Sequence, residues 1–515
     1  MSDDLPPQRP ELAALLARRA RGQDASRAEA VARRHARGYR TARENLADLI
    51  DEGSFLEYGE LAVAAQRNRR DYEDLQLETP ADGVITGIGR INSRWFPARA
   101  SRAAVAVYDY TVLAGTQGHF HHAKLDRLLE LAQRQRLPVV MYTEGGGGRP
   151  GDTDVTTQIA GLNVPTFARW AALETGQPRI AVNNGYCFAG NAALFGTADL
   201  RIATESAVIG MAGPAMIEGG GLGTFEPTEI GPAAVQWRNG LIDLLVEDEQ
   251  AATTAAKCIL GYFQGDTAGY DCADQRLLRD LLPEDRRWGY PVRRILETLF
   301  DSDSFLELQR VYGRSVITGL ARLGGRAVGV LASDCQQLGG AVDSEAADKA
   351  TRFLQLCDRT GLPVVSLVDT PGFMVGPASE EQGAVHRMSA LFRAGATLRS
   401  QLLAVFLRKG YGLGAMALVG GSFAVPDYSV AWPTGEFGGM GLEGAVRLGF
   451  RKELDAAPDD AAREALFERL LAELYSKGKA SEAASHLEID AVIDPAQTRD
   501  CLIEALGGAE RGDKH

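Results

Sequence analysis

Apolar positions along the chain recur with two different spacings, and these predict strands and helices in alternation. Residues 103–108 and 138–143 are nearly continuous apolar runs, which is typical of strands buried on both faces. Between them, residues 119–136 carry apolar side chains at helical spacing. These side chains are Leu125, Leu128, Leu129 and Ala132. A strand, a helix and a second strand in this order predict parallel strands joined by a helical crossover.

The same pattern returns in the second half of the chain. It predicts a strand over 326–332, a helix over 344–360 and a strand over 363–369. Because both halves alternate strands with helices of this length, the predicted fold class is α/β, with parallel sheet flanked by helices.

Short stretches of sequence also repeat in matching order. Leu-Pro-Val-Val at 137–140 returns at 362–365, an offset of 225, and Ser-Phe-Leu-Glu at 54–57 returns at 304–307, an offset of 250. The offsets drift only through small insertions, whereas an array of short repeats has a period of about 20 to 50 residues. The sequence therefore predicts two related domains in tandem, and one site built from two similar halves.

The flanking and connecting segments lack this pattern. Residues 1–45 are rich in Arg, Ala and Glu and predict a helical arm, and residues 264–291 predict a linker. The two domains are then expected at 46–263 and 292–515. Within the second domain, the charged and Ala-rich tail is expected to be helical from 457 to about 476.

Composition narrows the class of protein. The 515 residues carry a formal net charge of -13, and this argues against nucleic acid as a partner because phosphate binding needs a basic face. No apolar run approaches the roughly 20 residues that span a bilayer, and the start of the chain lacks the features of a signal peptide. We therefore expect a cytoplasmic protein without membrane contact. Its six cysteines include no C-x-x-C pair, so buried thiols are expected rather than a zinc ribbon.

Glycine-rich turns follow a strand in each half. Strand 179–183 runs into the small residues 184–194, and strand 403–408 runs into 409–416. At such a turn, successive amide N–H groups at the start of a helix point at any oxygen placed there. The turns are thus candidate oxyanion holes, although glycine before a helix also serves close packing alone.

Two further glycine loops, at 144–152 and 369–376, follow the preceding strand of each half. The first has no lysine at the place where a phosphate-binding loop needs one, and the G-x-x-x-x-G-K-[ST] motif is absent from the chain. A nucleotide site is therefore not expected, and both loops are predicted to wall the site.

Several motifs together carry a family resemblance. They are Asp109–Gly115, Asp369–Phe373, Ala431–Thr434 and Gly438–Gly441. Across roughly residues 35–500, their combination resembles the carboxyltransferase (beta) subunit of biotin-dependent acyl-CoA carboxylases. The resemblance implies two tandem crotonase-like domains, which agrees with the duplication.

Two segments resemble one branch of that family. Tyr142–Thr153 and Gly213–Gly221 are similar to the long-chain acyl-CoA carboxylases. In the family the facing domains come from two subunits, so the resemblance implies self-association, typically as a homohexamer. It also implies that the N-terminal domain takes the acyl-CoA side and the C-terminal domain the biotin side.

The resemblance further implies a mechanism. Carboxybiotin on a partner's arm supplies carbon dioxide and an anionic ureido group, which takes the α-proton of an acyl-CoA before the enolate attacks the carbon dioxide. Position in the family's motif assigns Ala189 and Gly190 to the thioester oxygen, and Gly414 and Ala415 to the biotin oxygen. The chain departs from the family at both turns, because Ala189 replaces a usual glycine and Leu413 is an extra residue.

Residues beside the turns are expected to contact the substrates. They are Gly146, Gly147, Phe188, Gly372, Phe373, Met416 and Ala417. Met416 can repack around varied chains and Ala417 is small and apolar, which favours a long or bulky acyl group. No methionine is followed by lysine, so biotin is expected on a separate biotin carboxyl carrier subunit, loaded by a biotin carboxylase.

Other interpretations of the same residues stay open. A crotonase-type hydratase needs an acid about one helical turn beyond the oxyanion glycine, and Ala193 and Leu418 stand there instead. A carboxyacyl-CoA decarboxylase subunit shares the transition state and differs only in direction. A noncatalytic scaffold subunit is disfavoured by the glycine turns in both halves. No metal is expected, because no Cys or carboxylate joins the histidines at 119, 121 and 122 at ligand spacing.

Overall fold

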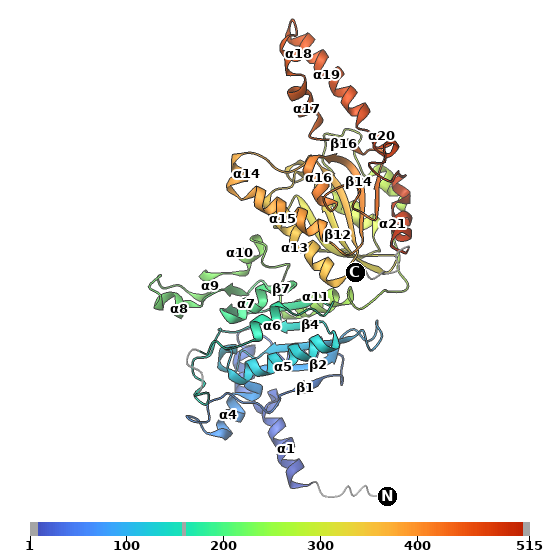
Figure 1. The fold of residues 1–515 in the computed structure, drawn as a ribbon. Helices are drawn as coiled ribbons and strands as arrows, with labels where there is room; N and C mark the ends of the chain where they lie inside the picture. The colour runs from blue at the N-terminus through green and yellow to red at the C-terminus, as the bar shows by residue number, and fades with distance from the viewer. Residues whose placement is uncertain (1–8, 157–160, 508–515) are drawn as a thin grey trace. The chain divides into compact units, whose positions relative to one another are not determined.

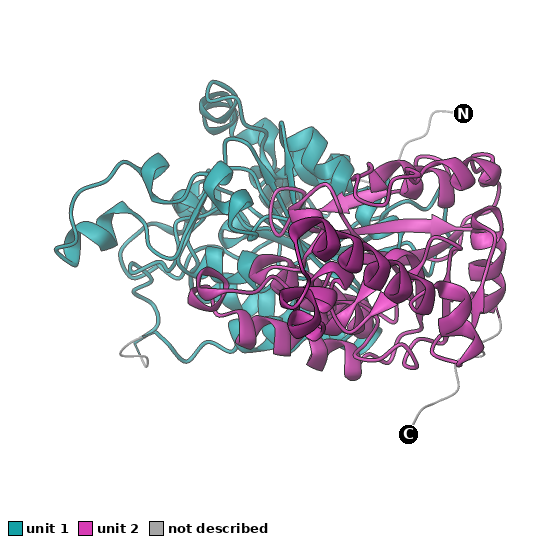
Figure 2. Ribbon diagram, turned by 90° about the horizontal axis from the view of Figure 1, so that it is seen from above, with its two compact units in different colours: residues 1–264 teal, residues 265–515 magenta. Residues whose placement is uncertain are grey.

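The chain folds into two compact units, residues 1–264 and residues 265–515 (Figure 2). The computed structural model describes residues 9–156 and 161–507. The first eight residues of the predicted arm and the last eight of the predicted second domain lie outside these ranges. Each unit is built on one large sheet with helices packed against it, so the α/β class is confirmed.

Unit 1, residues 1–264, contains a seven-stranded sheet in the order β1-β2-β3-β4-β5-β7-β9 (Figure 1). Its strands are β1 (Leu56–Tyr58), β2 (Val84–Arg90), β3 (Arg102–Tyr108), β4 (Val139–Tyr142), β5 (Arg179–Asn183), β7 (Leu200–Thr204) and β9 (Leu244–Val246). Strands β1 to β3 pair antiparallel, and the strands from β3 to β9 pair parallel. Helix α5 (His119–Gln135) connects β3 to β4 and buries all four of its predicted core residues, which confirms the predicted crossover.

Unit 2, residues 265–515, repeats this arrangement on an eight-stranded sheet. Its strands are β10 (Leu306–Leu308), β11 (Val316–Leu323), β12 (Arg326–Ser333), β13 (Val364–Thr370), β14 (Leu402–Tyr411), β15 (Tyr428–Ala431), β16 (Glu436–Gly438) and β17 (Ala491–Val492). Helix α13 (Ser344–Thr360) connects β12 to β13, as predicted. The predicted tail helix is also present, as α19 (Asp460–Lys477).

Further helices complete the two units. In unit 1 these are α1 (Pro10–Arg21), α2 (Ala28–His35), α3 (Ala42–Leu49), α4 (Tyr72–Glu78), α6 (Thr166–Ala171), α8 (Pro214–Gly219), α9 (Pro227–Ile230), α10 (Ala233–Arg238) and α11 (Glu249–Gly261). In unit 2 they are α12 (Val292–Leu299), α14 (Pro377–Glu381), α15 (Ala384–Ala396), α17 (Leu442–Gly449), α18 (Arg451–Asp455), α20 (Ala480–Ser485) and α21 (Thr498–Gly507).

A buried lysine occupies the same place in both units. Lys124 on α5 and Lys349 on α13 are separated by the repeat offset of 225, and their exposed fractions are 8% and 1%. The Lys124 Nζ donates to the carbonyl oxygen of Ala81 at 2.8 Å, and the Lys349 Nζ donates to those of Gln309 and Tyr312, both at 3.1 Å. Each ammonium thus holds the segment that leads into β2 in unit 1 or into β11 in unit 2, and this equivalence supports the duplication independently of the sequence matches.

The segments that precede the two sheets also correspond. Arg43 on α3 pairs with Glu57 at 3.0 Å, and Arg293 on α12 pairs with Glu307 at 2.5 Å. Both pairs fit the second repeat offset of 250, so the end of the predicted arm and the segment after the predicted linker are structural counterparts.

The described ranges contain no helix that is both long enough and apolar enough to cross a bilayer. All six cysteines lie in these ranges and form no disulfide. Cys187, Cys335 and Cys357 are buried as expected, whereas Cys258 and Cys272 are exposed. Cys258 is exposed because the buried residues of α11, such as Ala256 and Ile259, lie on other faces of that helix, and Cys272 lies in an irregular segment.

Candidate functional site

The first candidate turn joins a short strand to a short helix in unit 1. Strand β6 (Tyr186–Phe188) pairs in parallel with β8 (Val208–Gly210), and helix α7 (Gly190–Gly196) begins two residues after β6 ends. Ala189 stands between them with φ +51° and ψ -117°. A residue with a Cβ adopts such a conformation at a cost of about 1–3 kcal/mol, so the surrounding fold must hold it there.

The two amides predicted to bind the thioester oxygen, those of Ala189 and Gly190, differ in their hydrogen bonding. The Ala189 N–H donates to the Gly210 carbonyl oxygen at 3.1 Å and is therefore occupied within the fold. Gly190 is the first residue of α7, where no intrahelical acceptor exists. Among the described residues its N–H has no backbone acceptor, which leaves Gly190 as the open donor of this turn.

The glycine loop at 144–148 lies directly against this turn. The Gly145 N–H donates to the Tyr186 carbonyl at 2.7 Å, and the Phe188 N–H donates to the Gly145 carbonyl at 3.0 Å. A Cβ added at Gly147 would stand 2.9 Å from the Cβ of Ala189, so only glycine permits this approach. The predicted residues Gly146, Gly147 and Phe188 are thus brought together with the turn.

The second candidate turn follows β14 in unit 2. Helix α16 (Gly412–Leu418) begins immediately after Tyr411. A Cβ added at Gly414 would stand 2.5 Å from the carbonyl carbon of Gly372 and 2.7 Å from the nitrogen of Phe373. The predicted residues Gly372, Phe373 and Gly414 therefore lie next to one another.

Exposure differs among the predicted residues of α16. Ala415 and Ala417 are fully buried, Met416 is half-buried, and Leu413 has 60% of its surface exposed. The side chain of Ala417 faces the interior of unit 2, so Met416 and Leu413 are the side chains of this turn that solvent can reach.

Strand pairing shows how the two turns correspond. Phe188 ends β6 and pairs with Gly210 of β8, and Tyr411 ends β14 and pairs with Gly438 of β16. The residue that follows has a positive φ in both units. The two strand ends are therefore equivalent places in the two folds.

This equivalence aligns Ala189 with Gly412, whose φ values are +51° and +59°, and aligns Gly190 with Leu413. The predicted pair, which begins at Gly414, lies one residue further along α16. The repeat offset of 225 is not kept across the turn, because unit 1 bends between β5 and β6 whereas β14 continues without interruption. Leu413 thus occupies the place of the open donor rather than interrupting the turn.

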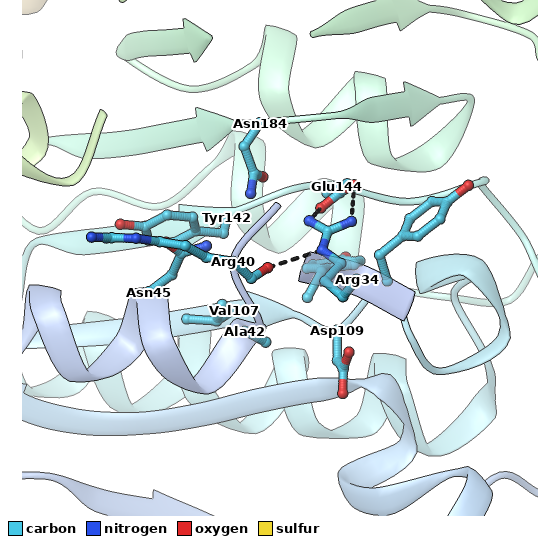
Figure 3. Close-up of a pocket in the computed structure, with 11 residues that line it drawn as sticks. Arg34, Arg40, Ala42, Asn45, Val107, Asp109, Tyr142, Glu144 and Asn184 are labelled. Carbon is cyan, nitrogen blue, oxygen red and sulfur yellow. Dashed lines mark hydrogen bonds and ion pairs between the residues drawn. The ribbon is translucent and has the colours of Figure 1, made fainter. Parts of the chain in front are cut away.

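A buried carboxylate stands beneath each turn, and the sequence alone did not single it out. Glu144 follows β4 and Asp369 is the second-last residue of β13, again at an offset of 225. In Figure 3 the Arg34 guanidinium faces Glu144, at 2.8 Å from Nη1 to Oε1. In unit 2 the Arg408 Nε donates to the Asp369 Oδ2 at 3.1 Å. In the sequence, only the matching positions of the two acids in the repeat could have indicated them.

The histidines near the start of α5 do not converge on one point. The His121 Nδ1 lies 3.1 Å from the Asp82 carbonyl oxygen, and the His122 Nδ1 lies 3.0 Å from the Thr166 Oγ1. Burial lowers the pKa of His122 to about 4 and that of His121 well below its ordinary value. Over the described ranges, no group of three His, Cys, Asp or Glu side chains has the geometry to hold a metal ion.

Comparison with known proteins agrees with these features. The family model described as "Carboxyl transferase domain" matches residues 33–512. The chain is 32% identical over 486 residues to the methylmalonyl-CoA carboxyltransferase 12S subunit of Propionibacterium freudenreichii subsp. shermanii, covering 92% of this chain and 90% of that protein. It is 31% identical over 497 residues to the biotin-dependent long chain acyl-coenzyme A carboxylase beta4 subunit of Mycobacterium tuberculosis, covering 93% and 90%.

Solved structures give the same result. A single-chain, multi-domain long-chain acyl-CoA carboxylase matches 97% of this chain with a TM-score of 0.90 and 53% identity. This chain spans 49% of that protein. The transcarboxylase 12S hexamer matches with a TM-score of 0.84 and 28% identity, covering 100% of this chain and 99% of the 12S chain.

The matches extend over nearly the whole chain and across both duplicated units. They confirm the resemblance carried by the motifs and identify the two units as tandem crotonase-like domains. The chain therefore belongs to the carboxyl transferase family, among the carboxyltransferase subunits of biotin-dependent acyl-CoA carboxylases.

Proposed function

We propose that the chain moves a carboxyl group from carboxybiotin, carried by a separate biotin carboxyl carrier subunit, to the α-carbon of a long-chain acyl-CoA. In that reaction carboxybiotin supplies the carboxyl carbon, whose bond to the ureido nitrogen breaks as this nitrogen takes the α-proton and the α-carbon takes the carbon dioxide. Negative charge therefore grows on two carbonyl oxygens, the thioester oxygen and the ureido oxygen. The protein must supply hydrogen-bond donors to both.

The observation that supports this proposal most strongly is the pair of equivalent strand-to-helix turns. Gly190 donates its N–H to the thioester oxygen in unit 1, and Leu413 donates its N–H to the ureido oxygen in unit 2. Gly414 and Ala415 complete the first turn of α16 around the second oxygen. A backbone donor aimed at a developing charge is worth ~3 kcal/mol of transition-state stabilisation in known cases. Neither turn needs an ionisable side chain, which fits the absence of an acid at Ala193 and Leu418.

Two observations support a preference for long acyl chains: the side chain of Met416 and the identity to a long-chain acyl-CoA carboxylase. Met416 is half-buried beside the second turn, and its unbranched thioether side chain adapts to varied apolar surfaces. The 53% identity to a long-chain acyl-CoA carboxylase supports the same substrate class. We therefore propose a long-chain acyl-CoA as the carboxyl acceptor.

Partners follow from what the reaction needs. A biotin carboxylase must load the carboxyl group, and a biotin carboxyl carrier subunit must deliver it to Leu413. Self-association as a homohexamer is also proposed, since the transcarboxylase 12S neighbour is a hexamer that matches the whole of this chain. Such an assembly allows the acyl side of one subunit to meet the biotin side of another.

The reverse half-reaction tests the proposal without any partner. Full-length protein is mixed with a long-chain carboxyacyl-CoA and free biotin, and the formation of acyl-CoA and carboxybiotin is followed by mass spectrometry. In this direction the C–C bond to the carboxyl group breaks, an N–C bond to biotin forms, and the proton of the biotin nitrogen moves to the α-carbon. We expect biotin-dependent turnover that is faster with the long-chain ester than with malonyl-CoA.

Two outcomes contradict parts of the proposal. Folded protein that binds the CoA ester but shows no biotin-dependent turnover supports the scaffold interpretation instead. Equal rates with short and long esters remove the support for a long-chain substrate while leaving carboxyl transfer in place.

A further inference from the structure

The N-terminal arm contributes a buried charge to the acyl-side turn. Arg34, in the last turn of α2, is only 7% exposed. Its guanidinium makes a two-point contact with Glu144, at 2.8 Å from Nη1 to Oε1 and 2.5 Å from Nη2 to Oε2 (Figure 3). A bidentate pair of this kind fixes the orientation of the carboxylate as well as its charge. The arm therefore reaches the strand end from which the glycine loop starts.

Glu144 connects this ion pair to the turn on two sides. Its chain neighbour Gly145 exchanges backbone hydrogen bonds with Tyr186 and Phe188, the strand residues that lead into Gly190. Its side chain packs on Gly185, where an added Cβ would stand 2.2 Å from the Glu144 Oε1. The carboxylate thus rests against the bend between β5 and β6, and the loop that it begins rests against the turn itself.

Arg34 also lies beside a second buried carboxylate, that of Glu249. Glu249 on α11 is 4% exposed, and its Oε1 lies 3.4 Å from the Arg34 Nη2. It also accepts from the Asn184 side chain and, at 2.6 Å, from the Arg40 backbone N–H. One guanidinium consequently serves two buried carboxylates, and its removal leaves the buried Glu144 without its cationic partner.

Unit 2 contains an equivalent buried ion pair, in which the arginine comes from a different element. Asp369 is fully buried at the place equivalent to Glu144 and is held by Arg408. Arg408 belongs to β14, the strand that leads into the second turn, whereas Arg34 belongs to an arm more than a hundred positions away from Glu144 in the sequence. The buried acid thus recurs beside the turn in both units, whereas the arginine that pairs with it comes from a different element in each. This favours a role of the acid that is tied to the turn.

We propose that Glu144, clamped by Arg34, is the positioning residue of the acyl-side turn: it holds the glycine loop and the bend at Gly185 so that the Gly190 N–H faces the thioester oxygen. This inference rests on the proposed function. It assigns to the arm a role in carboxyl transfer, in addition to any role in folding.

The test uses full-length protein in the reverse half-reaction with free biotin. Arg34→Met removes the clamp, and Arg34→Met combined with Glu144→Gln removes both charges while keeping their shapes. For Arg34→Met we expect kcat to fall by at least about tenfold with KM for the CoA ester changed by less than about threefold, since transition-state alignment is lost rather than ground-state binding. In the double variant we expect kcat to stay low, because the clamp is still missing, while part of the thermal stability lost in Arg34→Met returns, because no buried carboxylate is left unpaired.

A matched control separates positioning from general destabilisation. Arg201 on β7 forms a comparably buried pair with Asp243, with 2.9 Å between Nε and Oδ2, and lies in neither the loop nor the turn. Arg201→Met is expected to lower thermal stability while keeping kcat within about threefold of wild type.

The possible results are distinguishable. If folded Arg34→Met keeps wild-type kcat, or if Arg201→Met loses as much kcat, the positioning role is refuted. If the wild-type protein itself shows no transfer, the proposed function fails instead. Should Arg34→Met not fold, Glu144→Gln takes its place with the same expectation and the same refutation.

Discussion

Replacing Leu413 with proline removes a single hydrogen-bond donor from the proposed biotin-side turn. Leu413 is the second residue of α16, where an N–H has no intrahelical acceptor, so proline removes no bond of the helix. Its side chain is 60% exposed, which leaves room for the pyrrolidine ring. The substitution therefore deletes the N–H and little else.

The expected effects on catalysis and on stability differ in size. Loss of one oxyanion donor costs ~3 kcal/mol in the transition state, which corresponds to a fall in kcat on the order of a hundredfold. The free energy of unfolding should change by less than ~1 kcal/mol, because proline is accepted in the first turn of a helix. Catalysis should thus be lost in a protein that remains folded.

The assay is the biotin-dependent turnover of a carboxyacyl-CoA, with Leu413→Ala as the matched control. Alanine keeps the N–H and removes the same exposed side chain, so its kcat should stay within about threefold of wild type. Urea unfolding of both variants checks the fold. If Leu413→Pro is folded and as active as Leu413→Ala, the donor is not Leu413, and Gly414 or Ala415 must take that role.

Three further predictions concern stability. Ala189→Gly relieves a backbone held at φ +51° and should raise the free energy of unfolding by about 1 kcal/mol, seen as a higher Tm by calorimetry. Burial lowers the pKa of Lys124 to about 8 from 10.5, so between these pH values the unfolded chain binds the extra proton and stability rises with pH. Lys124→Met should lack that rise in urea unfolding measured from pH 8 to pH 10. Arg408→Met leaves the fully buried Asp369 with only Lys409, whose Nζ lies 4.0 Å from Oδ1 and whose backbone N–H donates to Oδ1, and should cost about 3 kcal/mol in urea unfolding, with partial recovery when Asp369→Asn is added.

Each of these three has a result that contradicts it. An unchanged or lower Tm for Ala189→Gly means that the positive φ carries no net cost. A parallel pH dependence of wild type and Lys124→Met means that the buried ammonium does not titrate in that range. A single Arg408→Met variant as stable as its double partner means that Asp369 is neutral in the folded protein.

The sequence by itself determined the architecture and the two turns. Spacing of apolar residues predicted β3, α5 and β4 and their counterparts in unit 2, because strand and helix periods are local properties of the chain. The glycines at 147 and 414 marked the places where two backbone segments approach closely. Repeated motifs at steady offsets then indicated the duplication.

Tertiary structure decided which atoms of the turns are open and what holds them. The Ala189 N–H is occupied by Gly210, and Leu413 stands in the place of Gly190, because strand pairing sets the register where a constant sequence offset no longer applies. The partner of Glu144 comes from Arg34 in the arm, far away in the sequence. Hydrogen-bond partners and buried ion pairs depend on distances in space, and the order of residues along the chain does not give those distances.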